Sequence, residues 1–305
     1  MKILITGGAG YKGLKLAQAL LLRGHAVTIL DNFMYGYDAA LHLLQYDRLT
    51  VVEKDIRNLE EKDIGSFDII YHLAGISGYP ACEANPNSAQ MINVVGTRRL
   101  VDLLGADQYL INASTTSFYG STGSVCSEEA RIAPVSLYGI TKYEAEKICL
   151  DHARCTNFRF ATIFGIAPRM RWDLLPNDFT MKAVQERSLV LFDSHSIRTF
   201  LHIDDAIDAY LMALDQPDAF YGQVFNVGGH SMNLSKMELA QEINKLVDFS
   251  IIEADMPDVD LRSFIIDFGK IEALGYVPKK TIEQGIAELI KLFRFYRPTR
   301  PYNTI

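Results

Sequence analysis

The chain has 305 residues, of which 49% are hydrophobic and 22% are charged, the balance of a globular protein with a sizeable core. This composition excludes low-complexity disorder and a small disulfide scaffold. The formal net charge of −7 shows no basic excess, so neither nucleic acid nor an anionic membrane surface is expected as a partner.

The cysteines point to a reducing environment. Cys82, Cys126, Cys149 and Cys155 form no C-x-x-C pair, and we expect plain thiols in a cytoplasmic protein. The first apolar run ends at Gly7, which makes it too short for a signal peptide. No stretch reaches the ~18 apolar residues of a membrane helix, and we predict no metal site.

The first half of the chain alternates short apolar runs with longer amphipathic ones. Strands are predicted at residues 2–6, 26–30, 49–53, 69–72, 109–112 and 157–162. Helices are predicted between them at residues 12–23, 39–44, 89–104 and 138–152. This alternation is typical of an α/β protein with a Rossmann-type, doubly wound parallel sheet that helices cover on both faces.

The pattern changes after Thr162, where residues 165–176 form a predicted loop that enters a different layer. Helices are predicted at residues 178–187, 204–214, 236–247, 270–274 and 282–293, and short strands at 189–192, 200–202 and 223–227. We expect a dinucleotide-binding domain over residues 1–165, with returning segments near 199–229. Residues 166–198 and 230–305 would form a smaller mixed α/β domain for the substrate, with the ligand cleft between the two at the carboxyl edge of the sheet.

A glycine-rich turn joins the first predicted strand to the first predicted helix. Gly7, Gly10 and Gly13 allow a tight turn, close approach of a pyrophosphate to backbone N–H groups, and close packing of helix on strand. Asp31 ends the second predicted strand, 18 residues after Gly13, where a carboxylate suits the ribose diol of NAD and repels the extra phosphate of NADP. The alternative is a structural turn beside a solvated aspartate. Lys12 has two interpretations, contact with the pyrophosphate or a position in solvent.

Tyr138 and Lys142 lie four residues apart at the start of a predicted helix and so share one face. A phenol is a poor base at pH 7, but a neighbouring cation favours the phenolate, which can take a proton from a hydroxyl while hydride leaves the same carbon. Tyr143 and Lys147 repeat the spacing about 140° around the helix. We choose Tyr138 because it lies nearer the carboxyl edge of the sheet, and we expect Tyr143 on an outer or subunit face.

Hydroxyl side chains follow the fifth predicted strand, from Ser114 to Ser117. Small hydroxyl groups at a strand end can bond a bound hydroxyl or a developing oxyanion. They can equally form a polar turn that satisfies its own backbone. Composition does not choose between these two interpretations.

Taken together, these features resemble the extended short-chain dehydrogenase/reductase superfamily, in its NAD-dependent sugar-nucleotide epimerase/dehydratase branch. The resemblance extends through almost the whole chain. The matching segments are the Gly7–Gly13 turn with Asp31, Asp55-Ile56, Tyr71–Gly75, Asn93–Thr97, Ser114–Gly120, Tyr138–Lys142, Arg198–Asp205, Phe225–Gly229 and Leu274–Pro278.

The resemblance implies a role for each matching residue. Tyr138 would be the catalytic base and acid, Lys142 the ribose-binding lysine beside it, and Thr115 the catalytic hydroxyl residue. The implied NAD-binding residues are Gly7, Gly10, Tyr11, Lys12, Gly13, Asp31, Asn32, Asp55, Ile56, Leu73, Ala74, Gly75, Asn93, Tyr138 and Lys142. The implied residues for a nucleotide-diphosphate sugar are Thr115, Thr116, Asn177, Arg198 and Arg262, the two arginines gripping the diphosphate.

Departures from the family pattern narrow the reaction. Dehydratases of the family carry Asp-Glu after the catalytic threonine, and decarboxylases carry Glu at the second position, where this chain has Thr116 and Ser117. Thr162 stands where many relatives have Asn, and the segment of residues 164–179 resembles GDP-heptose 4-dehydrogenases. We therefore expect oxidation at C4 of an NDP-hexose or NDP-heptose with release of the ketone. The alternatives are a UDP- or GDP-sugar 4-epimerase, and a non-catalytic NAD-binding regulator.

The resemblance also implies a homodimer, in which helices 89–104 and 138–152 of two copies form a four-helix bundle. Leu100, Leu103, Ile148 and Cys149 fit that seam and fit the core of one copy equally well.

Overall fold

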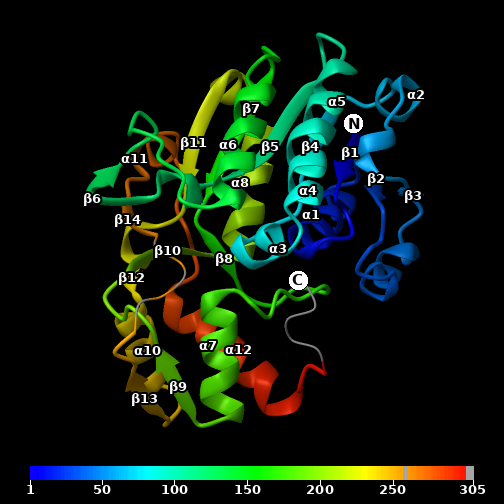
Figure 1. The fold of residues 1–305 in the computed structure, drawn as a ribbon. Helices are drawn as coiled ribbons and strands as arrows, with labels where there is room; N and C mark the ends of the chain where they lie inside the picture. The colour runs from blue at the N-terminus through cyan, green and yellow to red at the C-terminus, as the bar shows by residue number, and fades with distance from the viewer. Residues whose placement is uncertain (257, 259, 261, 300–305) are drawn as a thin grey trace.

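A parallel sheet forms the centre of the larger part of the molecule (Figure 1). The computed structural model describes residues 1–256, 258, 260 and 262–299. In these residues, seven strands pair in the order β3-β2-β1-β4-β5-β7-β11, each parallel to its neighbour. They are β1 (Lys2–Thr6), β2 (Ala26–Asp31), β3 (Leu49–Glu53), β4 (Ile69–His72), β5 (Tyr109–Thr115), β7 (Cys155–Phe160) and β11 (Gln223–Val227).

The position of each strand follows from its apolar content. Every residue of β4, β5 and β7 is buried, as expected for strands that helices cover on both faces. β3 is partly exposed along its length and occupies an edge of the sheet. The chain adds β2 and β3 on one side of β1, and then β4, β5, β7 and β11 on the other side. The order of the strands therefore reverses between β1 and β4, and a crevice opens at the carboxyl ends of these two strands.

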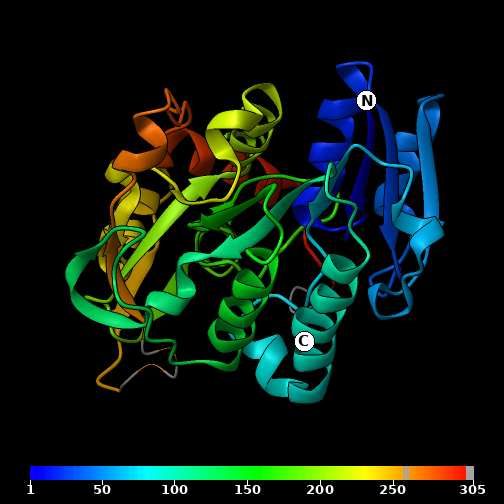
Figure 2. The same cartoon turned by 90° about the horizontal axis from the view of Figure 1, so that it is seen from above.

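Helices cover both faces of the sheet (Figure 2). On one face α1 (Tyr11–Leu22) and α8 (Ile203–Asp215) share a buried core with the strands. On the other, α5 (Thr97–Asp102) and α6 (Leu137–Cys149) contribute to a second core. The shorter helical segments of the chain are η1 (Asp38–Gln45), η2 (Ile56–Asn58), α2 (Glu61–Ile64), α3 (Tyr79–Ala84), α4 (Pro86–Gln90), η3 (Met91–Gly96), η4 (Thr116–Tyr119), α9 (Pro217–Phe220), η5 (His230–Met232) and α11 (Gly269–Glu272).

The smaller part lies below the large sheet in Figure 1 and has a core of its own. Its helices are α7 (Leu175–Gln185), α10 (Lys236–Asn244) and α12 (Ile282–Phe295). Among the described residues, two small sheets lie between the two parts: β8 (Thr162–Phe164) with β10 (Ile197–His202) and β12 (Asn233–Ser235), and β6 (Ser121–Cys126) with β14 (Ser263–Ile266). A third, β9 (Ser188–Leu191) with β13 (Ser250–Glu253), belongs to the smaller part.

The predicted fold class, a Rossmann-type doubly wound sheet with a smaller mixed part, is confirmed. The predicted helix 89–104 is wrong as a single α-helix. Its middle is the π-helical η3, in which the Asn93 side chain bonds the backbone N–H and carbonyl of Ile76. The domain limits at residues 165, 198 and 230 stay a prediction.

Among the residues that the structure describes, no helix combines the length and the apolar character needed to cross a membrane. All four cysteines lie in this described part, and each is buried as a free thiol.

Candidate active site

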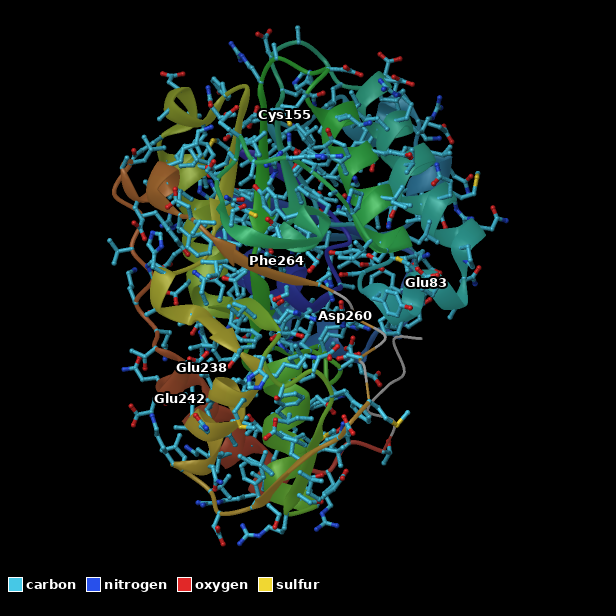
Figure 3. All side chains as sticks on the ribbon, turned by 60° about the vertical axis from the view of Figure 1, so that its left-hand side comes forward. Glu83, Cys155, Glu238, Glu242, Asp260 and Phe264 are labelled. Carbon is cyan, nitrogen blue, oxygen red and sulfur yellow. The ribbon has the colours of Figure 1, made fainter. Side chains whose placement is uncertain are left out.

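A cavity of about 470 Å³ opens at the carboxyl edge of the large sheet and is called the edge cavity here. The turns after β1, β2, β4 and β5 line it from one side, together with α6. The loop after β8 and parts of residues 198–262 line it from the other. Figure 3 labels Asp260, one of these lining residues, between the large sheet and the smaller part. The crevice predicted from the strand order is therefore where the two parts of the fold meet.

The glycine turn forms one wall of the edge cavity. Gly7 has a φ of 70°, and a Cβ there would lie 2.6 Å from the backbone nitrogen of Ala74. A Cβ on Gly13 would lie 2.6 Å from the carbonyl oxygens of Gly7 and Gly8. Gly10 caps α1 without a side-chain hydrogen bond, so the first N–H groups of the helix keep their donors for a ligand. This turn fits a pyrophosphate.

Asp31 stands at the end of β2 and lines the same wall. Its carboxylate accepts hydrogen bonds from the backbone N–H groups of Ala9, at 3.0 Å, and Phe33, at 2.9 Å. Burial raises its pKa despite these bonds. Asp31 therefore holds the glycine turn against β2 while its carboxylate faces the cavity, an arrangement that fits a ribose diol.

Asp55 lies next along this wall and is paired. Arg57 binds it through two nitrogens, at 2.8 and 2.7 Å, and lowers its pKa to about 2. The neighbours predicted to bind the cofactor also line the cavity; they are Gly7, Gly10, Tyr11, Lys12, Gly13, Asn32, Ile56, Leu73, Ala74 and Gly75. The Tyr11 hydroxyl donates to the carbonyl of Gly165, so this side chain ties α1 to the loop after β8.

Tyr138 and Lys142 reach the edge cavity from α6. Ser136 caps this helix by accepting a hydrogen bond from the N–H of Gly139 at 3.1 Å, which puts Tyr138 in the first turn. Lys142 is only 7% exposed, and burial lowers its pKa. Tyr143 does not line the cavity; its ring packs against Phe118, with 5.5 Å between ring centroids.

Thr115 ends β5 and also lines the cavity. Its hydroxyl accepts from the N–H of Ser117 at 3.1 Å and donates to the Ser117 hydroxyl at 3.0 Å. Arg262 donates to the same Ser117 hydroxyl at 2.6 Å. The hydroxyl segment therefore forms the capped turn of the second interpretation, with Thr115 in the cavity lining, and a bond from Thr115 to a bound hydroxyl stays a prediction.

Two arginines predicted to grip a diphosphate line the far side of the cavity. Arg198 is 2% exposed and pairs with Asp260 at 3.3 Å. Arg262 binds Asp260 through two nitrogens, at 2.7 and 2.6 Å. Burial alone would lower the pKa of Arg262, but Asp260, with a smaller contribution from Tyr138, raises it. Asp260 thus holds two guanidinium groups together on the side of the cavity that Tyr138 faces.

Three predicted site residues do not line the edge cavity. Thr116 donates to the carbonyl of Phe160 at 3.2 Å. Asn177 is fully buried, accepts from the N–H of Gly165 at 3.1 Å and donates to the carbonyl of Arg171 at 2.7 Å. Asn93 holds the backbone of Ile76 and donates to Thr141 at 3.1 Å. Each of these side chains positions the chain around the cavity.

The structure adds lining residues that sequence reasoning missed. Arg171 binds Asp173 through two nitrogens, at 2.7 and 2.6 Å. The guanidinium of Arg169 stacks over the ring of Tyr35 with its central carbon 3.8 Å from the ring centroid. The sequence marked residues 165–176 only as an unusual loop. The contact of this loop with the loop after β2 depends on the tertiary fold, so it could not be predicted.

Comparison with known proteins agrees with this geometry. Residues 3–228 match the model of the NAD dependent epimerase/dehydratase family. An uncharacterised UDP-glucose epimerase of Bacillus subtilis (strain 168), YtcB, is 32% identical over 251 positions, which cover 75% of this chain and 77% of that protein. UDP-glucuronate 4-epimerase 4 of Arabidopsis thaliana is 29% identical over 332 positions, which cover 96% and 75%.

Solved structures give the same result. UDP-glucuronic acid 4-epimerase from Bacillus cereus, in complex with UDP-glucuronic acid and NAD, has a TM-score of 0.85 and 26% identity over 96% of this chain and 99% of that one. A dTDP-glucose 4,6-dehydratase from Bacillus anthracis in complex with NAD has a TM-score of 0.83 and 25% identity, with 96% of each chain covered. The prediction of NAD as the cofactor is confirmed. The chain belongs to the NAD dependent epimerase/dehydratase family of nucleotide-sugar enzymes.

Proposed function

We propose that this enzyme inverts the C4 hydroxyl of a nucleotide-diphosphate sugar, through a 4-keto sugar that stays bound. One observation supports this most strongly. Thr115, Tyr138 and Lys142 line one cavity with two guanidinium groups, whereas residues 116 and 117 carry only hydroxyl groups. The cavity therefore has the groups for oxidising a hydroxyl and lacks, at these positions, the acid and base used for losing water.

The cofactor would lie with its pyrophosphate on the glycine turn and its adenosine ribose at Asp31. When bound, NAD supplies the acceptor and donor of hydride. Thr115 would hold the C4 hydroxyl, and Tyr138 would take its proton. Lys142 places a positive charge on the same helix face, where it stabilises the negative charge that the phenol acquires. Tyr138 would return the proton when the ketone is reduced from its other face.

The substrate diphosphate would bind Arg198 and Arg262, whose planar guanidinium groups match phosphate geometry. Anchoring at the diphosphate leaves the sugar free to turn, and this freedom allows both faces of C4 to meet the same hydride donor. Asp260 pairs with both arginines and so keeps them in place on this side of the cavity.

Dehydration and decarboxylation fit the site less well. The Thr116 hydroxyl is bonded to the backbone of β7, and the Ser117 hydroxyl is bonded by Thr115 and Arg262. The carboxylates that line the cavity near the arginines, Asp173, Asp258 and Asp260, are each paired with a cation. None of these groups is a spare acid or base for an elimination.

The relatives support epimerisation over the release of a ketone, because UDP-glucuronate 4-epimerases recur among them. A C4 dehydrogenase, such as one acting on a GDP-heptose, is the second candidate, and it shares every residue of the proposed mechanism. The base of the nucleotide and the identity of the sugar stay open in this proposal.

Product analysis tests the proposal. The purified enzyme is incubated with UDP-, GDP-, dTDP- and CDP-sugars, and each product is examined by mass spectrometry and chromatography. We expect one sugar to give an isomer of unchanged mass without accumulation of NADH. A product two hydrogens lighter, formed with one NADH per turnover, would contradict epimerisation and identify the dehydrogenase. Turnover of none of the sugars would contradict both.

We also propose a homodimer. Leu100 and Cys149 are fully buried, and Ile148 is 9% exposed, so these residues belong to the core of one copy. Met91, Val95 and Ile140 are instead exposed on η3 and α6, and these apolar side chains fit a seam between two copies. Light scattering should give twice the chain mass of 34.2 kDa, and Ile140→Glu should reduce it to the mass of a monomer. A wild-type monomer would refute the dimer.

A further inference from the structure

Lys12 lines the edge cavity together with Thr115, Tyr138 and Lys142, and the part of the cavity that these three residues line is called the catalytic end here. Lys12 belongs to the first turn of α1, directly after the glycine turn. Its ammonium lies 4.6 Å from the ring centroid of Phe160 and 5.9 Å from that of Tyr210. Phe160 is paired in register with Thr115 on the neighbouring strand. The Lys12 ammonium therefore lies over the ring of Phe160, the strand neighbour of Thr115, and contact of Lys12 with the pyrophosphate stays a prediction.

The surroundings of Lys12 hold positive charge without a counter-ion. The charged groups that act on it are Lys142 of α6 and Arg171 of the loop after β8, both cations. Tyr210 of α8 and Phe160 of β7 give it only aromatic rings. Among the described residues, no carboxylate pairs with its ammonium, whereas Lys15 on the next turn is paired with Asp204.

This position is unfavourable for a positive charge. Burial, followed by the repulsion of Lys142 and Arg171, lowers the pKa of Lys12 to about 7. The N-terminus of α1 adds a partial positive charge of its own. An apolar side chain of similar length would cover Phe160 and Tyr210 without this cost. Packing alone therefore does not account for a lysine here.

A cation at this place acts on a ring whose charge changes. The oxidised nicotinamide ring carries a positive charge and the reduced ring carries none, so a nearby ammonium disfavours the oxidised form relative to the reduced form. Lys142 lies on the helix face that carries Tyr138, whereas Lys12 approaches from α1, so the two cations reach the catalytic end from different elements.

We propose that Lys12 shifts the balance of the bound cofactor toward its reduced form and so favours the 4-keto sugar over the alcohol. Lys12 takes no proton or hydride in the reaction; hydride passes from C4 to the cofactor, and the hydroxyl proton passes to Tyr138. The inference rests on the proposed function in one respect, the position of the redox ring beside Tyr138.

Binding measurements on the enzyme without sugar test this inference. Dissociation constants for NAD⁺ and for NADH are measured by calorimetry for the wild type, Lys12→Met and Lys12→Arg. Lys12→Met should raise the ratio of the NADH constant to the NAD⁺ constant on the order of tenfold. Lys12→Arg keeps the charge and should leave the ratio near the wild-type value. A ratio that is unchanged in Lys12→Met would overturn the proposal, even if both constants rise together.

The wild type supplies a second readout that needs no variant. Lys12 is protonated below its pKa, so the preference for NADH should be greater at pH 6 than at pH 9. The groups that face Lys12 are Lys142, Arg171 and the Tyr210 phenol. The same pH series on Lys12→Met measures the contribution of these other groups, which is then subtracted from the wild-type result. A preference that does not change with pH in the wild type would contradict a role for the Lys12 charge. Because no turnover is measured, a failed epimerase assay does not affect either result.

Discussion

Replacing Tyr138 by Phe is expected to lower kcat by about 10²- to 10⁴-fold, the usual contribution of a positioned acid–base group. The change removes one hydroxyl from the first turn of α6 and keeps the ring, so the helix and its Ser136 cap should stay intact. NAD affinity should change little, since the pyrophosphate and adenosine ends of the cofactor bind elsewhere. The measurements are steady-state turnover of the sugar that the product analysis identifies and calorimetric titration with NAD.

Tyr143→Phe is the matched control, because it removes the same atom from the same helix outside the edge cavity. Its kcat should stay within about twofold of wild type, as expected when no reacting group is touched. Near-normal turnover in Tyr138→Phe, or an equal loss in both variants, would remove Tyr138 from the proposed mechanism.

Replacing Arg262 by Ala is expected to raise KM for the nucleotide sugar on the order of 10- to 100-fold, with a smaller effect on kcat. The guanidinium lines the edge cavity, and loss of its charge-assisted hydrogen bonds to a diphosphate weakens ground state and transition state alike. NAD affinity should be unaffected, because Asp31 and the glycine turn lie on the opposite wall. Initial rates across a range of substrate concentrations give both constants.

Two further variants separate binding from folding. Arg262→Lys keeps the charge but loses the planar fork, and should fall between the wild type and Arg262→Ala. Arg23→Ala removes a guanidinium from an exposed pair with Asp215, where little effect on KM or stability is expected. An unchanged KM in Arg262→Ala would refute the diphosphate contact, and a large fall in melting temperature would show a structural role through Asp260 instead.

Much of the central sheet could be predicted because its strands are short segments rich in apolar residues. The predicted ranges 2–6, 49–53, 69–72 and 223–227 are those of β1, β3, β4 and β11. Each is a short run with apolar residues next to glycine, aspartate or another charged residue. In a doubly wound sheet, such runs form strands. The glycine turn and Asp31 could be placed for the same reason, since both lie at the ends of these strands.

Other features depend on contacts between distant segments. β6 was not predicted because Ser121–Cys126 is mostly polar and exposed, and it becomes a strand by pairing with β14, more than a hundred residues away. The helical run over residues 86–102 contains a π-helical segment at residues 91–96, where Asn93 bonds the backbone of Ile76, 17 residues earlier. Neither of these contacts can be predicted from the local pattern of apolar and polar residues.

The same limit applies within the site. The family pattern indicated Arg198 and Arg262, but Asp260, which holds them together, was not recognised because one of its partners, Arg198, lies in a distant segment. Asn177 and Thr116 were grouped with the substrate residues by their place in the pattern, and their side chains are instead bonded to the backbone around the cavity. The cytoplasmic location stays a prediction.

The stacking of Arg169 over Tyr35 has a consequence for the lifetime of the complex. The two side chains come from loops on opposite sides of the edge cavity, after β8 and after β2, and so form a strap beside Asp31. A dinucleotide leaving by that route must first separate the ring from the guanidinium, an interaction worth about 0.5–2 kcal/mol. We expect slow exchange of the dinucleotide. Slow exchange suits the proposed epimerase, because its cofactor is oxidised again at the end of each cycle and need not leave.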